Sequence, residues 1–136
     1  MKANDLMIRS WVMLGEKKKL RCYGANTHTN DVFLENGVVT NVSELTPIPL
    51  TTEILEKNGF VKDKSVGYCE RYIWADSMRL SHTVVEFSFG DDGATMLNCW
   101  TKLNDGENNI HICDPNYVHE LQQALRLCGI KKEIEL

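Results

Sequence analysis

The chain of 136 residues lacks long apolar runs and the short motifs that mark many enzymes. No stretch approaches the roughly 20 consecutive apolar residues of a membrane-spanning helix, and the beginning, MKANDLMIRSW, lacks the uninterrupted apolar segment of a secretory signal. A glycine-rich phosphate loop, a nucleophile elbow and a dinucleotide fingerprint are also absent. We therefore expect a cytoplasmic protein that carries no cofactor.

Cysteine is present, but not in the pattern of a disulfide framework or a structural zinc site. The five cysteines include no C-x-x-C pair; they are Cys22, Cys69, Cys99, Cys113 and Cys128. We interpret them as reduced and mostly buried thiols. Cys99, His111 and Cys113 could meet on two neighbouring strands, with His111 and Cys113 on one strand face, but a fourth metal ligand is missing. We expect no bound metal.

Positive charge is also scarce. The 19 acidic residues outnumber 15 basic ones, which gives a net charge of −4 and a pI near 5.5. A protein that binds the nucleic-acid backbone normally carries a basic face, so we expect no nucleic-acid partner. The main basic cluster, Lys17 to Lys19 with Arg21, is interpreted as a solvated charge run in a hairpin loop, with contact to an anion as the alternative.

The overall composition, 43% hydrophobic and 25% charged, is ordinary for a globular protein.

Two stretches of the sequence are predicted to form helices that end in the same way. In the later one, Asp114 and Pro115 predict the helix start, and Gly129 predicts a left-handed residue just after the helix end. Ile130 would then fold back onto Leu125, as in a Schellman ending.

An apolar stripe runs along this later helix at spacings of three and four residues. Its members are Val118, Leu121, Ala124, Leu125 and Cys128. Such a stripe needs a core to pack against, and we expect helix 117–128 to lie across one face of the sheet that precedes it.

The earlier stretch, Pro47 to Phe60, repeats this ending in a shorter helix. Thr51 suits the N-cap, Gly59 suits the left-handed position, and Phe60 is the residue that folds back. At about two turns this helix could not persist alone, so Ile54, Leu55 and Phe60 must be docked on other elements.

Short β-prone runs fill the remainder of the chain and are separated by turn compositions. Before the first helix they cover residues 6–14, 20–24, 32–35 and 38–42. Asn36-Gly37 is a strong hairpin signal between the last two of these. After the first helix the runs cover residues 67–76, 82–89, 94–103 and 110–113.

These elements predict an α+β protein with mostly antiparallel strands. The first four strands would form a small curled sheet, for which an SH3-like barrel is one arrangement, and the later four would form a second meander. We expect a single compact domain over residues 1–136. The alternative is two sub-domains, 1–46 with the small sheet and 47–136 with the meander and both helices, because Ser43 to Pro49 is the most boundary-like stretch.

Three segments carry a family resemblance: MKANDLMI-x-x-WV at the start, PIPLT-x-EILEKNGF in the middle and YVHELQ-x-ALRLCGI-x-KEIE near the end. With them the chain resembles a family of small uncharacterised proteins encoded by prophages and other mobile elements of anaerobic gut bacteria. Relatives usually have I-G-D-W-V near the start, where Ile8 to Val12 of this chain is I-R-S-W-V. The resemblance implies a mobile-element setting and no particular activity.

The candidates for catalysis are four histidines and three carboxylates: His28, His82, His111, His119, Glu86, Asp91 and Asp92. None stands in a specific motif. His82 and His111 could lie on neighbouring strands, as in phosphoesterases with two H-x-[ST] motifs, but the third position is valine in one case and cysteine in the other. General acid–base chemistry needs a partner within reach, so we expect structural roles and assign no catalytic residue.

Aromatic and arginine side chains are the remaining candidates for ligand binding. They are Trp11, Tyr23, Arg71, Trp74, Arg79 and Trp100. Such side chains anchor protein partners, and they can also stack on and pair with a nucleotide-like ligand. The simpler interpretation is that most of them fill a β core.

Three functions remain open. The first is a non-enzymatic accessory protein of a mobile element that binds a host or phage protein. The second is a sponge that captures a nucleotide-type signal of bacterial defence, with the aromatic and arginine residues as its clamp. The third, a phosphoester hydrolase, rests only on His82 and His111. The sequence is also compatible with a homo-oligomer.

Overall fold

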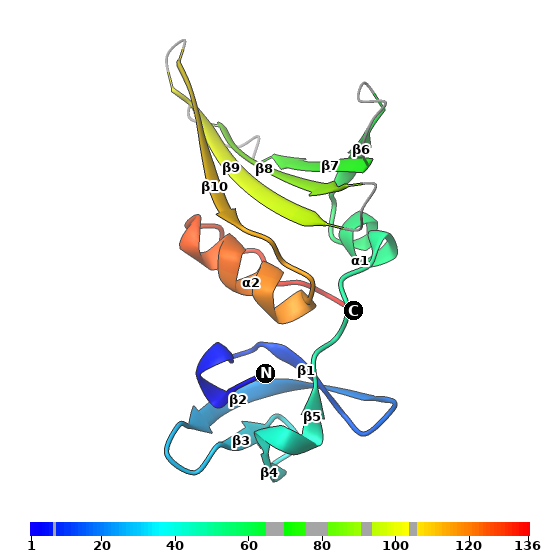
Figure 1. Ribbon diagram of the computed structural model, residues 1–136, viewed down its shortest axis with the longest axis vertical. Helices are drawn as coiled ribbons and strands as arrows, with labels where there is room; N and C mark the ends of the chain where they lie inside the picture. The colour runs from blue at the N-terminus through cyan, green and yellow to red at the C-terminus, as the bar shows by residue number, and fades with distance from the viewer. Residues whose placement is uncertain (7, 65–69, 76–81, 91–93, 104–105) are drawn as a thin grey trace. The chain divides into compact units, whose positions relative to one another are not determined.

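The computed structural model describes residues 1–6, 8–64, 70–75, 82–90, 94–103 and 106–136. Within these residues the protein is α+β, with mostly antiparallel strands in two sheets, a short central helix and a C-terminal helix, as the sequence predicts (Figure 1). No helix of this described part is long and apolar enough to cross a membrane. The chain divides into two compact units: residues 1–49 with 117–132, and residues 50–116 with 133–136.

The first unit contains an antiparallel sheet with strand order β4-β3-β2-β1-β5. Its elements are η1 (Ala3–Asp5), β1 (Trp11–Leu14), β2 (Lys18–Asn26), β3 (Asp31–Leu34), β4 (Val39–Asn41), η2 (Val42–Glu44) and β5 (Leu45–Thr46), where η denotes a 3₁₀ helix. The hairpin predicted at Asn36-Gly37 is confirmed, because Phe33 lies opposite Val39 and Gly37 has a φ of +79°.

The first strand is shorter than the sequence predicts. An extended run is expected from residue 6, but β1 begins at Trp11. The Asp5 carboxylate accepts a hydrogen bond from the backbone N–H of Lys2 at 2.6 Å, which closes residues 3–5 into a 3₁₀ turn. Leu6, directly after this turn, is buried in the core of the sheet.

The core of the first unit lies on the inner side of this sheet, to which alternate residues of the strands point. Its buried members are Leu6, Val12, Leu20, Cys22, Val32, Leu34 and Leu45. Between Cys22 and Gly24 the register of β2 against β3 shifts, which indicates a β-bulge. A bulge bends its strand and increases the local twist, so this one curls the sheet around the core.

Helix α2 (Val118–Leu127) belongs to the first unit, whereas the sequence places it on the second meander. It lies against β1. Arg126 Nη1 donates to the backbone carbonyl of Ile8 at 2.7 Å, and the Gln123 amide donates to the carbonyl of Asp5. Most of the apolar stripe is buried, as expected. A stripe alone does not specify which sheet it covers.

The predicted helix start at Asp114 and Pro115 is wrong, because α2 begins at Val118 with Tyr117 as its N-cap. The backbone N–H of Val118 donates to the carbonyl of Ile48 at 2.9 Å. This bond pairs the chain before the helix with a distant segment and keeps it extended, which overrides the local preference of proline for the first helical turn.

The end of α2 is confirmed as a Schellman motif. The backbone N–H of Ile130 donates to the carbonyl of Leu125, and that of Gly129 donates to the carbonyl of Arg126, both at 2.9 Å. Gly129 has a φ of +74°, and a Cβ built there would meet no atom within 4 Å. The backbone conformation, and not a lack of space, therefore requires glycine at this position.

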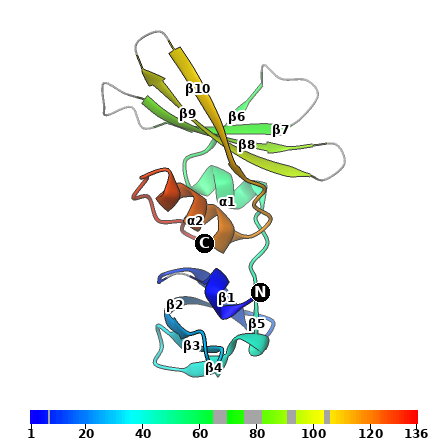
Figure 2. The same ribbon diagram turned by 60° about the vertical axis from the view of Figure 1, so that its left-hand side comes forward.

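The second unit contains, within its described residues, an antiparallel sheet with strand order β10-β9-β8-β7-β6 (Figure 2). Its strands are β6 (Val61–Asp63), β7 (Glu70–Ala75), β8 (His82–Phe89), β9 (Thr95–Leu103) and β10 (Gly106–Cys113). The sequence misses β6 and begins the last strand at residue 110. One face of the sheet is buried, and its core side chains include Tyr72, Val85, Phe87 and Leu97.

Helix α1 (Thr52–Lys57) precedes this sheet and has the predicted cap and ending. The hydroxyl of Thr51 accepts a backbone N–H of the first turn at 3.4 Å. At the other end, Gly59 has a φ of +83°, and the N–H of Phe60 donates to the carbonyl of Leu55 at 3.0 Å. Leu55 and Phe60 are both buried, as expected for a helix too short to persist alone.

Asn58 ties α1 to the last residues of the chain. Its Nδ2 donates to the carbonyls of Ile54 and Glu135, both at 2.8 Å, and its Oδ1 accepts the backbone N–H of Glu135 at 2.9 Å. The side chain is buried, so removing it would leave the backbone N–H and carbonyl of Glu135 without these partners, whereas the carbonyl of Ile54 would keep the backbone N–H of Asn58 at 3.2 Å.

We expect Gly129→Val to lower the free energy of unfolding by about 1–2 kcal/mol, because a β-branched residue is strained at positive φ. Gly129→Asn should cost only a fraction of this, because asparagine tolerates the left-handed region. Chemical denaturation of the three proteins measures both differences. Equal losses for valine and asparagine would contradict a conformational origin.

Asn58→Ala should lower the free energy of unfolding by roughly 2–4 kcal/mol, because the part-buried N–H and carbonyl of Glu135 both lose their side-chain partner. Asn26 is a matched control: its Oδ1 accepts the backbone N–H of His28 at 3.0 Å in an exposed turn. Asn26→Ala should cost less than about 1 kcal/mol. Urea titration measures both losses, and losses of the same size would show that burial of Asn58 does not matter.

Candidate binding surfaces

The outer side of the first sheet carries an aromatic–arginine pair. Side chains alternate along β1 and β2, so Val12 and Leu20 point into the core. Trp11 and Arg21, which lie opposite each other, point outward. The guanidinium carbon of Arg21 lies 4.7 Å from the centroid of the Trp11 ring, within range of cation–π attraction. Glu35 Oε1 accepts the backbone N–H of Arg21 at 3.1 Å and holds the strand beneath the pair.

The bulge in β2 brings apolar side chains to the same outer side. The register shifts next to Gly24, which lies opposite Phe33, so the extra residue Tyr23 points outward beside Phe33. Phe33 in turn lies opposite Val39. Tyr23, Phe33 and Val39 are 61%, 45% and 55% exposed. Gly24 leaves the Phe33 ring open, because a Cβ there would stand 3.9 Å from it.

We call this surface the aromatic face and define it by Trp11, Arg21, Tyr23, Phe33 and Val39. Tryptophan, tyrosine and arginine are the side chains that most often dominate the free energy of protein association. Tyr23, Phe33 and Val39 together expose roughly 300 Å² of side-chain surface, which is the size of the largest apolar patch on many monomers. The aromatic face is therefore suited to hold an apolar segment of another molecule.

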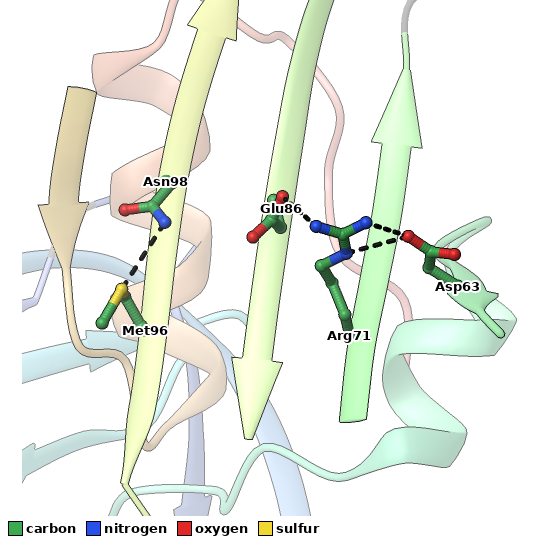
Figure 3. A network of polar contacts seen from close by, with 5 residues as sticks. All are labelled: Asp63, Arg71, Glu86, Met96 and Asn98. Atoms are coloured by element: carbon green, nitrogen blue, oxygen red, sulfur yellow. Dashed lines mark hydrogen bonds and ion pairs between the residues drawn. The ribbon is translucent and has the colours of Figure 1, made fainter. Parts of the chain in front are cut away.

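A row of polar side chains crosses the second sheet on the face opposite its core. The row consists of Asp63, Arg71, Glu86, Asn98 and His111, one from each strand. Arg71 lies between two carboxylates: its Nε donates to Asp63 Oδ2 at 2.9 Å and its Nη1 donates to Glu86 Oε2 at 3.4 Å (Figure 3). The Asp63 and Glu86 side chains are only 17% and 19% exposed, so the protein largely shelters these charges from water.

A cavity of about 390 Å³ lies beside this row, and a volume of this size is typical of small-molecule sites. It follows the two paired strands β8 and β9. Its lining includes Glu86, Ser88 and Gly90 on one strand and Asn98, Met96 and Ala94 on the other. The sequence signal for this cavity is the presence of small residues at alternate positions of neighbouring strands. It becomes recognisable only when the pairing of the two strands is known.

Of the six side chains that the sequence singles out, the four that the structure describes lie in two different units. Trp11 and Tyr23 lie together on the aromatic face of the first unit. Arg79 and the side chain of Trp100 lie outside the described residues. Phe33 and Val39 are missing from the predicted set, although strand alternation places them on the same side as Tyr23.

The other two members of the predicted set, Arg71 and Trp74, point to opposite faces of β7. Arg71 lies opposite Ser88 and belongs to the polar row. Trp74 lies opposite the buried Val85 and therefore faces the core of the second sheet. In a strand without a bulge, a spacing of three residues separates side chains in this way.

The described histidines are dispersed. His28 and His111 are exposed and lie in different units, and His111 Nε2 is 3.3 Å from the carboxylate of Asp114. The side chain of His82 lies outside the described residues, as do Asp91 and Asp92.

The prediction that His111 and Cys113 share a strand face is wrong. The register shifts between them, so that His111 lies opposite Asn98 and Cys113 lies opposite Leu97. Asn98 and Leu97 are neighbours in β9 and point to opposite faces, so the bulge turns Cys113 away from His111. Within the described residues, no group of three or more histidine, cysteine, aspartate and glutamate side chains could hold a metal ion.

Three cysteines have described side chains, and all three are free thiols: Cys22, Cys113 and Cys128. Cys22 is fully buried, its thiol donates to the carbonyl of Gly24 at 3.3 Å, and burial raises its pKa. Cys113 and Cys128 are only partly buried. The expectation of buried thiols thus holds for Cys22, and the side chains of Cys69 and Cys99 lie outside the described residues.

His119, in the first turn of α2, is a buried histidine. It is 3% exposed, and its ring stacks on that of Tyr117 with centroids 5.9 Å apart. Its Nδ1 has no hydrogen-bond partner among the described residues. Burial lowers the pKa of His119 and outweighs the opposing effect of the Glu120 and Asp5 carboxylates.

No family model matches the chain, and no curated protein or solved structure is significantly similar to it. The resemblance to a mobile-element family therefore stays a prediction.

We expect the free energy of unfolding to fall as the pH drops below about 6.5, the ordinary pKa of histidine. The pKa of His119 is lowered in the folded state, so the unfolded state binds more protons in this range and protonation favours unfolding. The His119 contribution is complete above that pH and is lost as the pH falls toward the lower, folded-state pKa.

His119→Gln should remove this part of the pH dependence, whereas His28→Gln, at an exposed position, should retain it. Chemical denaturation at several pH values between about 7.5 and 5 measures the slope for each protein. A slope that is the same in the wild type and in His119→Gln would rule out the assignment.

Proposed function

We propose that the protein is a non-enzymatic binding module that holds an apolar segment of another protein on its aromatic face. The observation that supports this most strongly is the exposure of Tyr23, Phe33 and Val39 side by side on neighbouring strands. Large apolar side chains that are exposed together, and not singly, indicate interaction sites. The family resemblance further supports an accessory protein of a mobile element, whose partner would be a host or phage protein in the cytoplasm.

The size of the aromatic face favours a short segment over a second copy of the chain. A stable protein interface buries about 800 Å² on each partner, whereas Tyr23, Phe33 and Val39 expose roughly 300 Å². A segment that inserts one or two apolar side chains beside Phe33 would cover this area. We expect a weak complex, because ordering a flexible segment offsets much of the gain from apolar burial.

The Trp11–Arg21 pair would border this contact. Arg21 lies two residues before Tyr23 on β2 and points to the same side. Its guanidinium is already held over the Trp11 ring, so it loses little conformational freedom when a partner binds. Arginine and aromatic side chains are enriched among the residues that dominate the free energy of protein association.

Two other functions have less support from the geometry. For the nucleotide clamp, Arg71 lies between the Asp63 and Glu86 carboxylates, which would repel a phosphate, and Trp11 and Tyr23 lie in the other unit. The phosphoester hydrolase would need His111 to act together with a second histidine. Among the described residues, the polar contacts of His111 are with Asn98 and Asp114.

Panning a phage-displayed peptide library against the full chain tests the proposed function. We expect enrichment of peptides that carry two or more apolar side chains. These peptides should bind at least about tenfold more weakly to Tyr23→Ser and to Phe33→Ser, because each exchange removes a central anchor. Fluorescence anisotropy with labelled peptides measures the affinities.

Val61→Ser is the matched control, because Val61 is 69% exposed on a strand of the other unit. It should bind the enriched peptides as the wild type does. Thermal melting checks that all three variants fold, which is expected since none of the exchanged side chains is in the core. A library that yields no enriched peptide, or peptides that bind all variants equally, would refute the proposed function.

A further inference from the structure

The cavity of the second unit, which we call the trough, has one end lined mainly by small side chains. Ser88 and Met96 lie opposite each other on β8 and β9. Gly90 and Ala94 follow at the strand ends, where the backbone N–H of Gly90 donates to the carbonyl of Ala94 at 2.7 Å. Three of these four residues are too small to fill the space over the strands, so about 390 Å³ remains open. Such a volume is large enough for a planar ring system.

The other end of the trough is polar. Glu86 and Asn98 lie opposite each other there, and Arg71 lies beside Glu86 (Figure 3). Glu86 Oε2 accepts from Arg71 at 3.4 Å, while no described residue donates a hydrogen bond to Glu86 Oε1. Asn98 Nδ2 donates to the thioether of Met96 at 3.5 Å, a weak acceptor that a ligand oxygen could replace. This end therefore offers an acceptor and a donor side by side.

The charges at the polar end favour a neutral ligand group. Among the described residues of this ion-pair group, Asp63 and Glu86 carry two negative charges and Arg71 carries one positive charge, so their charges repel a phosphate or carboxylate. The sheltered Glu86 carboxylate favours N–H donors, which form their strongest hydrogen bonds with an ionised acceptor. A simple ammonium ion would satisfy Glu86 but would leave the Asn98 donor without a better partner.

We propose that the trough binds the lactam edge of a guanine-type nucleobase. That edge presents a carbonyl next to two N–H donors. The carbonyl accepts from Asn98 Nδ2, the two N–H groups donate to Glu86, and the ring lies over Ser88 against Met96. An adenine-type edge presents a ring acceptor where guanine presents a donor, and would direct it at the Glu86 carboxylate. The trough lies in the second unit, so this inference goes beyond the proposed protein-binding function of the aromatic face.

Calorimetric titration of the full chain with neutral nucleosides tests the inference. Guanosine should bind. Inosine, which lacks the second N–H donor, should bind about tenfold more weakly, and adenosine at least about 30-fold more weakly, because a site built for hydrogen bonds rejects analogues that leave its groups unpaired. Methylguanidine has the donors without the carbonyl and should also bind at least about tenfold more weakly than guanosine.

Glu86→Gln should weaken guanosine binding at least about tenfold, because an amide replaces the ionised acceptor. Glu70→Gln is the matched control: Glu70 is an exposed carboxylate on β7 that pairs with Lys62, and its exchange should leave guanosine binding unchanged. Ala94→Leu provides an independent variant, because Ala94 is exposed and leucine would fill the small end of the trough and abolish binding.

Thermal melting confirms that these variants are folded before their affinities are compared. Four results would each overturn the inference: no heat with guanosine at about 1 mM, equal affinity for adenosine, equal affinity for methylguanidine, or unchanged guanosine affinity in folded Glu86→Gln.

Discussion

In a sheet with one buried face, every second side chain points to the core, and an inserted residue is what reverses this order. Strand β2 contains such an insertion between Cys22 and Gly24. Cys22 before it and Ala25 after it both pack in the core, which leaves Tyr23 and Gly24 together on the outer side. The filling of the core and the composition of the aromatic face thus depend on the same bulge. Without the bulge, alternation that keeps Cys22 in the core would turn Ala25 outward, and alternation that keeps Ala25 in the core would expose Cys22 and bury Tyr23.

Much of the fold could be predicted because its signals are local. A glycine at C′ with an apolar residue after it determines a helix end within six residues, and both endings, at Gly59 and Gly129, have the predicted hydrogen bonds. The features that the sequence missed depend on distant partners. The start of α2 is determined by pairing with Ile48, and the role of Asn58 depends on Glu135, 77 residues further along the chain.

The candidate sites show the same division between local and distant information. Residue type alone selected Trp11 and Tyr23, which lie on one surface, but it also grouped Arg71 with Trp74, which strand alternation separates. Two side chains of one strand share a face or not depending on whether a bulge interrupts the alternation between them. The bulge between His111 and Cys113 has no signal in the pattern of polar and apolar residues. The trough is harder still to predict, because it is defined by side chains that are small.

Along the chain, the main part of the second unit, residues 50–116, is inserted into the first unit, and residues 133–136 complete the second unit after α2. All strands of the first sheet are synthesised before the inserted residues, but helix α2, which lies against β1, follows after them. During synthesis, the side of the first sheet that contacts α2 therefore stays uncovered until the inserted residues and then α2 have left the ribosome. Contacts between segments so far apart form late and slowly. Apolar surface that is exposed during this interval favours aggregation, and fast folding of the inserted segment or binding of a chaperone would counter it.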